Sequence, residues 1–448
     1  MSDPLITLEA LQLTFEVIKV LFAMAFGACV GSLSNVLVYR IPLGLDFISP
    51  QSRCTNCDTK LTWRENIPIF GWLFLGGRCR FCKSPVSAEY PLVEAFMAGL
   101  WGLTFVVCYT DRATWLGKLV LPVRPEWAYG GFDQTWPIYI AIVMLFACLT
   151  CATLVDWRTF TIPPIFTNVP VVLAVVAYPL WAWYISTQPG GLLQQTSPGH
   201  TWSLATFGEY GWTWLGAALG GVAGLILANL ALKFKLMRRS FEDYTAWEKE
   251  WLTKLEQEGK DPNNPENWIA YPHARREMLR EILFVGFPLA FALAGFALAH
   301  KLAGPWIYNP NTFAMETSAN AAVPLALQVL TGVLMGYLVG GGVVWLFRIL
   351  GSLGFGKEAL GLGDVHLMAA VGAVLGWIDP VIAFFGGAIL GMVIFLIQLF
   401  RNKDTDKDTG RVMPFGPPLC MAVVLLFFAK PAFEALASWA MKTPIDLP

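Results

Sequence analysis

The chain of 448 residues is apolar and carries few charges. Hydrophobic residues make up 56% of it and charged residues 14%, whereas soluble globular chains are roughly 25% charged. This composition excludes a disordered chain, and a net charge of −1 provides no basic surface for nucleic acid. The class that remains is a multi-span membrane protein, which needs the lipid bilayer to cover its apolar surface.

Ten apolar runs predict transmembrane helices, because a helix needs about 20 apolar residues to cross the hydrocarbon core. The eighth run is short, and the last is interrupted at Lys430 and Pro431. We therefore expect an all-α polytopic membrane protein with about ten transmembrane helices. The runs lie at 17–39, 91–109, 137–155, 165–185, 211–232, 282–300, 325–347, 365–379, 381–400 and 417–439.

The positions of Lys and Arg predict the orientation of these helices, because short translocated loops exclude both residues. If the loop 41–90 lies inside, most of the 31 Lys and Arg residues fall in inside segments. Both termini then lie outside. The stretch 187–210 contains neither Lys nor Arg and is expected to be an exported loop.

The loop 41–90 contains two Cys-x-x-Cys pairs, Cys54 with Cys57 and Cys79 with Cys82. Each pair turns tightly enough to present both sulfur atoms to one ion, so the two together predict a tetrahedral zinc site. The alternatives are two disulfides, which a reducing compartment disfavours, or chance pairs of buried thiols. We expect a small zinc-binding cytoplasmic domain.

The other long inside loop, 233–281, has balanced charge. Ser240-Phe-Glu-Asp243 resembles a helix-start signal. The spacing of the apolar residues that follow predicts an amphipathic helix, which either lies on the inner membrane face or packs against neighbouring loops. These residues are Phe241, Tyr244, Trp247, Trp251, Leu252 and Leu255.

Two carboxylates at the ends of apolar runs are candidate catalytic groups, because an ionisable group at membrane depth is costly. Asp156 closes the third run, and Asp364 opens the eighth in Gly361-Leu-Gly363-Asp364. The predicted orientation places both at the inner face. Taken singly, each has a structural alternative: Asp156 could pair with Arg158, and Asp364 could cap a helix.

If the two carboxylates meet, each raises the cost of ionising the other, so that one stays protonated near neutral pH. The ionised group would take a proton from a water that attacks a peptide carbonyl, and the protonated group would donate to the oxyanion. Gly361 and Gly363 have no Cβ, which lets an extended substrate strand or another helix approach the backbone.

With these motifs in order, the chain resembles the type 4 prepilin leader peptidases of the GxGD membrane aspartyl protease class. The resemblance begins with Gly27 to Pro42 and the paired cysteines. It continues through Glu89-Tyr-Pro-Leu-Val-Glu94 and Asp156, and ends with Gly361 to Asp364 and Pro414-Phe-Gly-Pro417.

The resemblance implies a bifunctional enzyme of the bacterial inner membrane with its active site on the cytoplasmic side. Asp156 and Asp364 would be catalytic, and Gly361 and Gly363 would form the active-site motif. The substrates would be type IV prepilins or type II secretion pseudopilins, which lose a short leader and are then N-methylated with S-adenosylmethionine. Zinc in the family is structural. Glu94 is a candidate for methylation, with a buried polar contact as the alternative.

Two departures from the family pattern stand out. His366 lies where the family commonly has Lys, and the segment 211–300 adds a transmembrane hairpin. The sequence does not indicate the role of the segment 211–300, the oligomeric state of the protein or which pilins it cuts. The expected segments are a first transmembrane helix in 1–40, the zinc domain in 41–90, helices with the first Asp in 91–210, the extra hairpin in 211–300 and helices with the GxGD motif in 301–448.

Two other classes of protein fit parts of this pattern. One is a membrane transporter with a zinc-ribbon loop, in which both aspartates would line an ion path. A transporter would be expected to place polar groups in broken helices near mid-membrane, whereas these aspartates lie at helix ends. The other is a scaffold that binds pilins without cutting them.

Overall fold

The computed structural model describes residues 4–46, 52–110, 124–188, 211–260, 271–302, 306–310, 314–317, 323–356, 358–401 and 414–442. These residues divide into two compact units: the first comprises residues 1–203 and 382–448, and the second comprises residues 204–381. The loop expected at 187–210 lies almost entirely outside the described residues.

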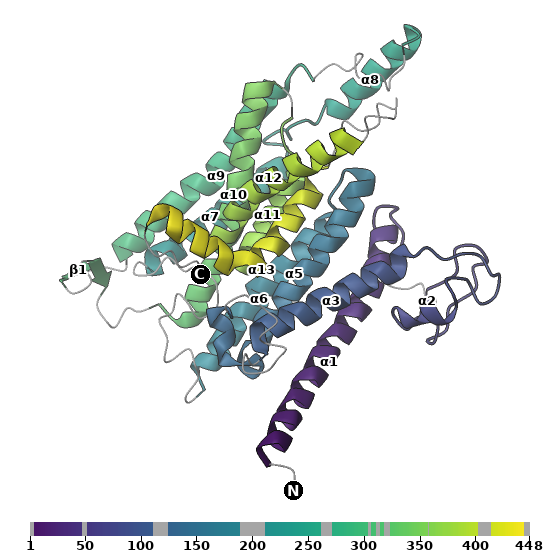
Figure 1. Cartoon of the computed structure of the whole chain (residues 1–448). Coiled ribbons are helices and arrows are strands. Elements are labelled where there is room, and N and C mark those ends of the chain that lie inside the picture. Colours follow the sequence, from purple (N-terminus) through teal and green to yellow (C-terminus); the bar gives the residue numbers. More distant parts are fainter. Residues whose placement is uncertain are drawn as a thin grey trace. The chain divides into compact units, whose positions relative to one another are not determined.

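The first unit contains the amino-terminal helices, the cysteine-rich loop and the carboxyl-terminal helix (Figure 1). Several of its helix boundaries follow local rules. For example, α6 begins directly after Pro163 with a proline at its first position, where the missing N–H costs nothing. Its elements are α1 (Pro4–Arg40), α2 (Phe70–Phe74), α3 (Glu89–Tyr109), η1 (Glu126–Gly130), α5 (Phe132–Thr159), α6 (Pro164–Ser186), most of α12 (Ile378–Arg401) and α13 (Gly416–Met441).

Within this unit, α1 and α3 lie side by side (Figure 1). Glycines on α1 allow the close approach: a Cβ on Gly31 would lie 2.7 Å from the Cα of Glu94, and one on Gly27 would lie 2.6 Å from the carbonyl oxygen of Met97. Small residues at such a contact are typical of membrane helix pairs. The same α3 helix begins at the end of the cysteine-rich loop, so this packing fixes where that loop enters the helices.

The second unit is built from two helix pairs, and a short helix and a β-hairpin lie in the connections. In the first pair α7 packs on α9, and in the second α10 packs on α11. Two antiparallel strands, β1 and β2, were not predicted from the sequence. The elements are α7 (Gly211–Lys233), α8 (Tyr244–Gln257), α9 (Ala274–Leu302), β1 (Trp306–Asn309), β2 (Ala314–Thr317), α10 (Leu325–Phe355) and α11 (Leu362–Leu375).

The all-helical membrane fold is confirmed. Among the described residues, nine helices are long and apolar enough to cross a membrane. They correspond to nine of the ten predicted runs, and α13 continues through Lys430 and Pro431. The remaining run, the eighth at 365–379, falls largely in the shorter helix α11, which spans 14 residues. At 1.5 Å per residue α11 covers about 21 Å, less than the roughly 30 Å of a hydrocarbon core.

The helix predicted in the loop 233–281 is present as α8, but its predicted start signal is wrong. Asp243 is the residue that precedes α8, and no side chain caps this end. The hydroxyl of Ser240 donates instead to Glu281 at 3.0 Å. Tyr244 and Trp247 pack on the ring of Tyr271 at 5.6 and 5.3 Å, which favours the alternative of packing against a neighbouring loop.

Candidate functional site

The two cysteine pairs lie in turns of the same construction. In each pair the N–H of the first cysteine donates to a carbonyl oxygen five residues later, at 3.0 Å in the first turn and 2.9 Å in the second. The residue that follows the second cysteine, Asp58 or Lys83, has a positive φ of 52° or 60°. This left-handed residue lets the chain reverse within a few residues, so both thiols of a pair face the same side.

The two turns bring all four thiols together. The sulfur atoms of Cys54 and Cys82 are 3.8 Å apart, and those of Cys57 and Cys79 are 4.0 Å apart. All four sulfur atoms lie within 4.8 Å of one another. The cluster could therefore hold one metal ion.

Polar groups favour the metal-binding thiolate form of two of the four cysteines, Cys54 and Cys82, whereas burial and hydrogen bonds with neighbouring thiols raise the pKa of Cys79. A hydrogen bond with the Ser84 hydroxyl, with a further contribution from the Ser84 backbone, lowers the pKa of the Cys82 thiol to about 5. Backbone N–H groups of Cys57 and Asn56 lower the pKa of Cys54.

A buried carboxylate on α3 fastens the cysteine-rich loop to the helices. Glu94 is 8% exposed and accepts a hydrogen bond from the backbone N–H of Ile69 at 2.6 Å. Ile69 has a φ of 63°, an unfavourable value for a β-branched residue. The contact matches the buried polar role that was one of the two alternatives for Glu94.

Asp156 lies in the last turn of α5 and is 6% exposed. Its Oδ2 accepts a hydrogen bond from the backbone N–H of Gly416, the first residue of α13, at 3.2 Å. A Cβ on Gly416 would lie 2.5 Å from the same oxygen. Only glycine therefore allows the backbone this close to the carboxylate.

The structural alternative for Asp156 was an ion pair with Arg158. In the described residues Arg158 pairs instead with Glu89, the first residue of α3. No role was predicted for Gly416. Its signal in the sequence was its place in Pro414-Phe-Gly416-Pro417, which resembles the family pattern but indicates no contact with Asp156.

Asp364 is the third residue of α11 and is 6% exposed. The residue that caps this helix is Gly361, in an extended conformation, so Asp364 is not the helix cap. A Cβ on Gly361 would lie 3.4 Å from the Oδ2 of Asp364, an ordinary contact distance. Gly363 is the second residue of the helix, between the cap and the carboxylate.

Asp156 belongs to the first unit and Asp364 to the second. Each carboxylate is buried at a helix end within its own unit. Their approach to each other stays a prediction.

Comparison with known proteins identifies the amino-terminal part of the chain. Residues 25–108 match the Bacterial Peptidase A24 N-terminal domain. This stretch of the chain is similar to the peptidase A24 family. This range begins in α1, includes the four cysteines and ends in α3, so the predicted resemblance is confirmed.

Curated relatives match over parts of their lengths. A prepilin leader peptidase/N-methyltransferase of Myxococcus xanthus is 46% identical over 99 residues, which are 22% of this chain and 28% of that protein. One of Klebsiella pneumoniae is 40% identical over 88 residues, 18% of this chain and 39% of that protein.

A longer match is to an enzyme of Escherichia coli O78:H11 named type 4 prepilin-like proteins leader peptide-processing enzyme. The two chains are 28% identical over 224 residues, and the match covers 46% of this chain and 68% of that protein. The chain thus spans between about a quarter and two thirds of the length of these relatives. No solved structure matches the chain.

Proposed function

We propose that the protein is a prepilin peptidase that cuts the leader from type IV prepilins or type II secretion pseudopilins. The main support for this proposal is that two features occur in one chain. The match to the A24 amino-terminal domain is followed by Asp156 and Asp364, and each of these aspartates is buried at a helix end. The curated relatives are named for this activity.

In this proposal the two aspartates act as an acid and base pair. The ionised carboxylate takes a proton from the attacking water, and the protonated one donates to the carbonyl oxygen of the scissile peptide. The Gly416 N–H donates to Asp156 and fixes the direction of that carboxylate. Gly361 and Gly363 leave space for the substrate backbone beside Asp364.

The four thiols would hold one structural zinc ion. Zinc–sulfur bonds of about 2.3 Å in a tetrahedron place sulfur atoms about 3.8 Å apart. The separations of 3.8 Å for Cys54 with Cys82 and 4.0 Å for Cys57 with Cys79 fit this geometry. Bound zinc would hold the two turns together as one domain and would take no part in hydrolysis.

N-methylation of the new amino terminus, with S-adenosylmethionine as donor, is the second proposed activity. Its support is the name of the relatives, together with the match of residues 25–108 to the A24 amino-terminal domain. Mass spectrometry of processed pilin tests it, because a methylated terminus is about 14 Da heavier than a cleaved and unmodified one. Cleaved pilin without this mass would contradict the methyltransferase activity alone.

The proposed location is the bacterial inner membrane, with both aspartates at the cytoplasmic face. The loops 41–90 and 233–281 contain more Lys and Arg than the loops predicted to lie outside, and this difference supports the orientation. A scissile bond at the inner edge of the substrate's own apolar helix would then meet the helix ends that hold Asp156 and Asp364.

The decisive experiment is co-expression of the Asp156→Asn and Asp364→Asn variants with candidate prepilins. Each substitution keeps the shape of the side chain and removes its acid and base chemistry, so leader cleavage should fall at least about 1,000-fold while the protein stays folded. Asp133→Asn, an exposed change in the first turn of α5, is the matched control and should cut at the normal rate.

Normal processing by either active-site variant would refute the pair of aspartates. A wild-type protein that binds pilins without cutting them would favour the scaffold, and ion flux abolished by the same two variants would favour the transporter.

A further inference from the structure

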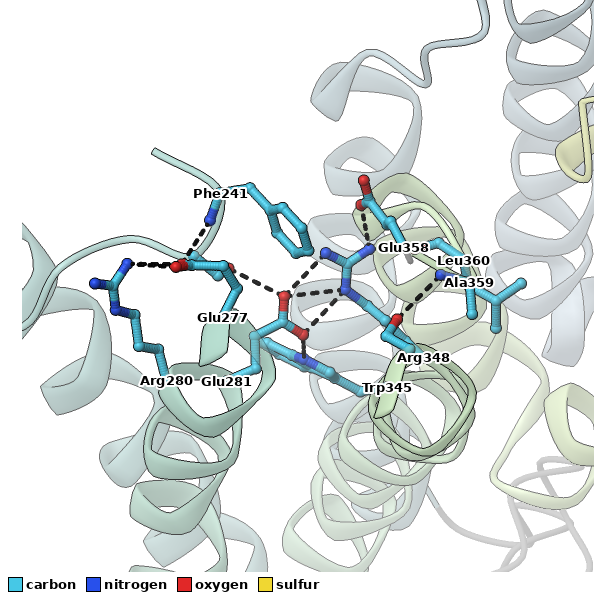
Figure 2. A network of polar contacts seen from close by, with 11 residues as sticks. Phe241, Glu277, Arg280, Glu281, Trp345, Arg348, Glu358, Ala359 and Leu360 are labelled. Carbon is cyan, nitrogen blue, oxygen red and sulfur yellow. Dashed lines mark hydrogen bonds and ion pairs between the residues drawn. The ribbon is translucent and has the colours of Figure 1, made fainter. Parts of the chain in front are cut away.

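A buried ion pair in the second unit joins α9 to α10. Glu281 and Arg348 are 3% and 2% exposed. The guanidinium of Arg348 donates through Nε to both oxygens of Glu281, at 3.1 and 3.0 Å, and through Nη2 to Oε1 at 2.9 Å (Figure 2). Trp345 and Ser240 donate to the same carboxylate at 2.8 and 3.0 Å. Both charges therefore have partners in a fixed geometry.

The remaining donor of Arg348 reaches the segment that precedes the GxGD motif. Its Nη1 donates to Glu358 at 2.6 Å and to the carbonyl oxygen of Leu360 (Figure 2). In the same segment the N–H of Ala359 donates to the hydroxyl of Ser352 at 3.0 Å. Because Gly361 follows directly and caps α11, these bonds fix the chain where it enters that helix.

The partner that holds Arg348 comes from the segment 211–300, which the resemblance did not explain. Glu281 lies on α9, and the connection between α7 and α8 covers the pair from one side. Phe241 lies 5.6 Å from the guanidinium, and its backbone N–H donates to Glu277 at 3.1 Å. The added segment thus provides both the counterion of the arginine, from α9, and its cover, from the connection between α7 and α8.

A buried ion pair is weak evidence for stability, because apolar side chains of similar size often serve as well. The bond from Arg348 to a backbone carbonyl is different, since it needs a donor that an apolar side chain lacks. Arginine can pair with one carboxylate through two nitrogens and still present a third nitrogen elsewhere. The geometry thus accounts for an arginine at this position.

We propose that Arg348, held in place by Glu281 of the added hairpin, is a positioning residue that sets the GxGD turn and with it the carboxylate of Asp364. This inference rests on the proposed peptidase function. The helices of 211–300 then act on catalysis without contact to the substrate, and Glu281 acts only through Arg348.

The test compares three variants of the full-length protein: Arg348→Met, Glu281→Gln and the double variant. The double variant removes both buried charges and leaves an amide oxygen for Trp345 or Ser240, so it should fold even if Arg348→Met, with its unpaired Glu281, does not. We expect the kcat for leader cleavage by the double variant to fall by about 10- to 100-fold, with KM within about twofold, because a small misplacement of a catalytic group costs this much.

Hydrogen exchange gives a second readout that does not depend on peptidase activity. The amides of residues 359–364 should exchange at least about tenfold faster in the double variant than in the wild type, while those in the middle of α10 stay unchanged. The matched control is Lys254→Met on α8, in the same segment 211–300. Lys254 pairs with Glu250 and both side chains are exposed, so its loss should leave both kcat and exchange of 359–364 unchanged.

A double variant with wild-type kcat and unchanged exchange would overturn the positioning role. If the double variant exchanges faster but the wild-type protein cuts no prepilin, the proposed function is refuted, whereas the structural role of Arg348 stands. Slow exchange with a low kcat would refute the inference while supporting the peptidase.

Discussion

At the scale of single residues, the contact between Gly416 and Asp156 is the most specific feature of the candidate active site. The glycine N–H donates to the carboxylate at 3.2 Å, and a Cβ at this position would lie 2.5 Å from Oδ2 and 3.2 Å from the carboxyl carbon. The Gly416→Ala variant should therefore turn the carboxylate away from its place and lower the rate of leader cleavage by about 100-fold. Initial rates on a purified prepilin in detergent measure this effect.

Gly386→Ala is the control for this prediction. Gly386 lies on α12 in the same unit, and its added Cβ would meet the side chain of Ala422 at 3.6 Å, an ordinary contact. This variant should cut at the wild-type rate. If Gly416→Ala also cut at the wild-type rate with an unchanged melting temperature, the geometry around Asp156 would have no part in catalysis.

Single residues were predictable from the sequence where their partners are close along the chain. The cysteine pairs form their turns from local hydrogen bonds, so their spacing was enough to predict the cluster. The hydrogen bond from Gly416 to Asp156 joins positions 260 residues apart and left no periodic signal. Ser240 was misread as part of a helix start because a distant acceptor, Glu281, takes its hydroxyl.

At the scale of elements, α10 and α11 pack so closely that a glycine is required between them. A Cβ on Gly336 would lie 2.0 Å from the carbonyl oxygen of Gly372, a backbone atom that cannot move aside alone. Gly336→Ala should therefore destabilise the protein by about 1–3 kcal/mol, through displacement of α11. Thermal unfolding in detergent should show a lower midpoint.

Gly342→Ala on the same helix should have the opposite effect. Gly342 is exposed, and nothing lies within 4 Å of its added Cβ. Alanine there should leave stability unchanged or raise it by up to about 1 kcal/mol, because it favours the helix over the unfolded chain. Equal midpoints for the Gly336 and Gly342 variants would show that the close contact of α10 with α11 has no energetic weight.

The long helices were predictable because their apolar runs reach about the 20 residues that a helix needs to cross the bilayer. The β-hairpin of β1 and β2 was missed because its strands have four residues each, too few for an alternating pattern to stand out. The end of α11 was placed too late in the run 365–379. The helix stops at Leu375, before Gly376, whose φ of 95° does not continue a helix.

At the scale of the whole molecule, the chain divides into two units, and the candidate functions divide with it. The first unit holds the cysteine cluster and Asp156, and the match to the A24 amino-terminal domain also falls within it. The second holds the GxGD motif together with α7 and α9, the helices of the segment predicted to be an addition to the family pattern. Removal of zinc should therefore affect the first unit and leave the folding of the second unit intact.

The prediction for the whole molecule is that the purified protein contains one zinc ion per chain, and that zinc can be removed without loss of the membrane fold. Cys57→Ala removes one of four thiolates and should lower zinc content below about 0.2 per chain, because a three-thiolate site leaves the ion open to chelators. The loop 52–88 should then become sensitive to protease, since the ion would hold its two turns to each other.

The matched control is Cys29→Ala, which removes an exposed thiol on α1 outside the cluster. This variant should keep one zinc ion and a protease-resistant loop, as measured by elemental analysis and by the peptides released. Leader cleavage by Cys57→Ala should stay within about threefold of the wild type, because the ion supports the turns and lies outside the proposed chemistry of Asp156 and Asp364. Loss of cleavage in proportion to loss of zinc would show instead that the metal takes part in hydrolysis, and fewer than one zinc ion in the wild type would refute the four-thiolate site.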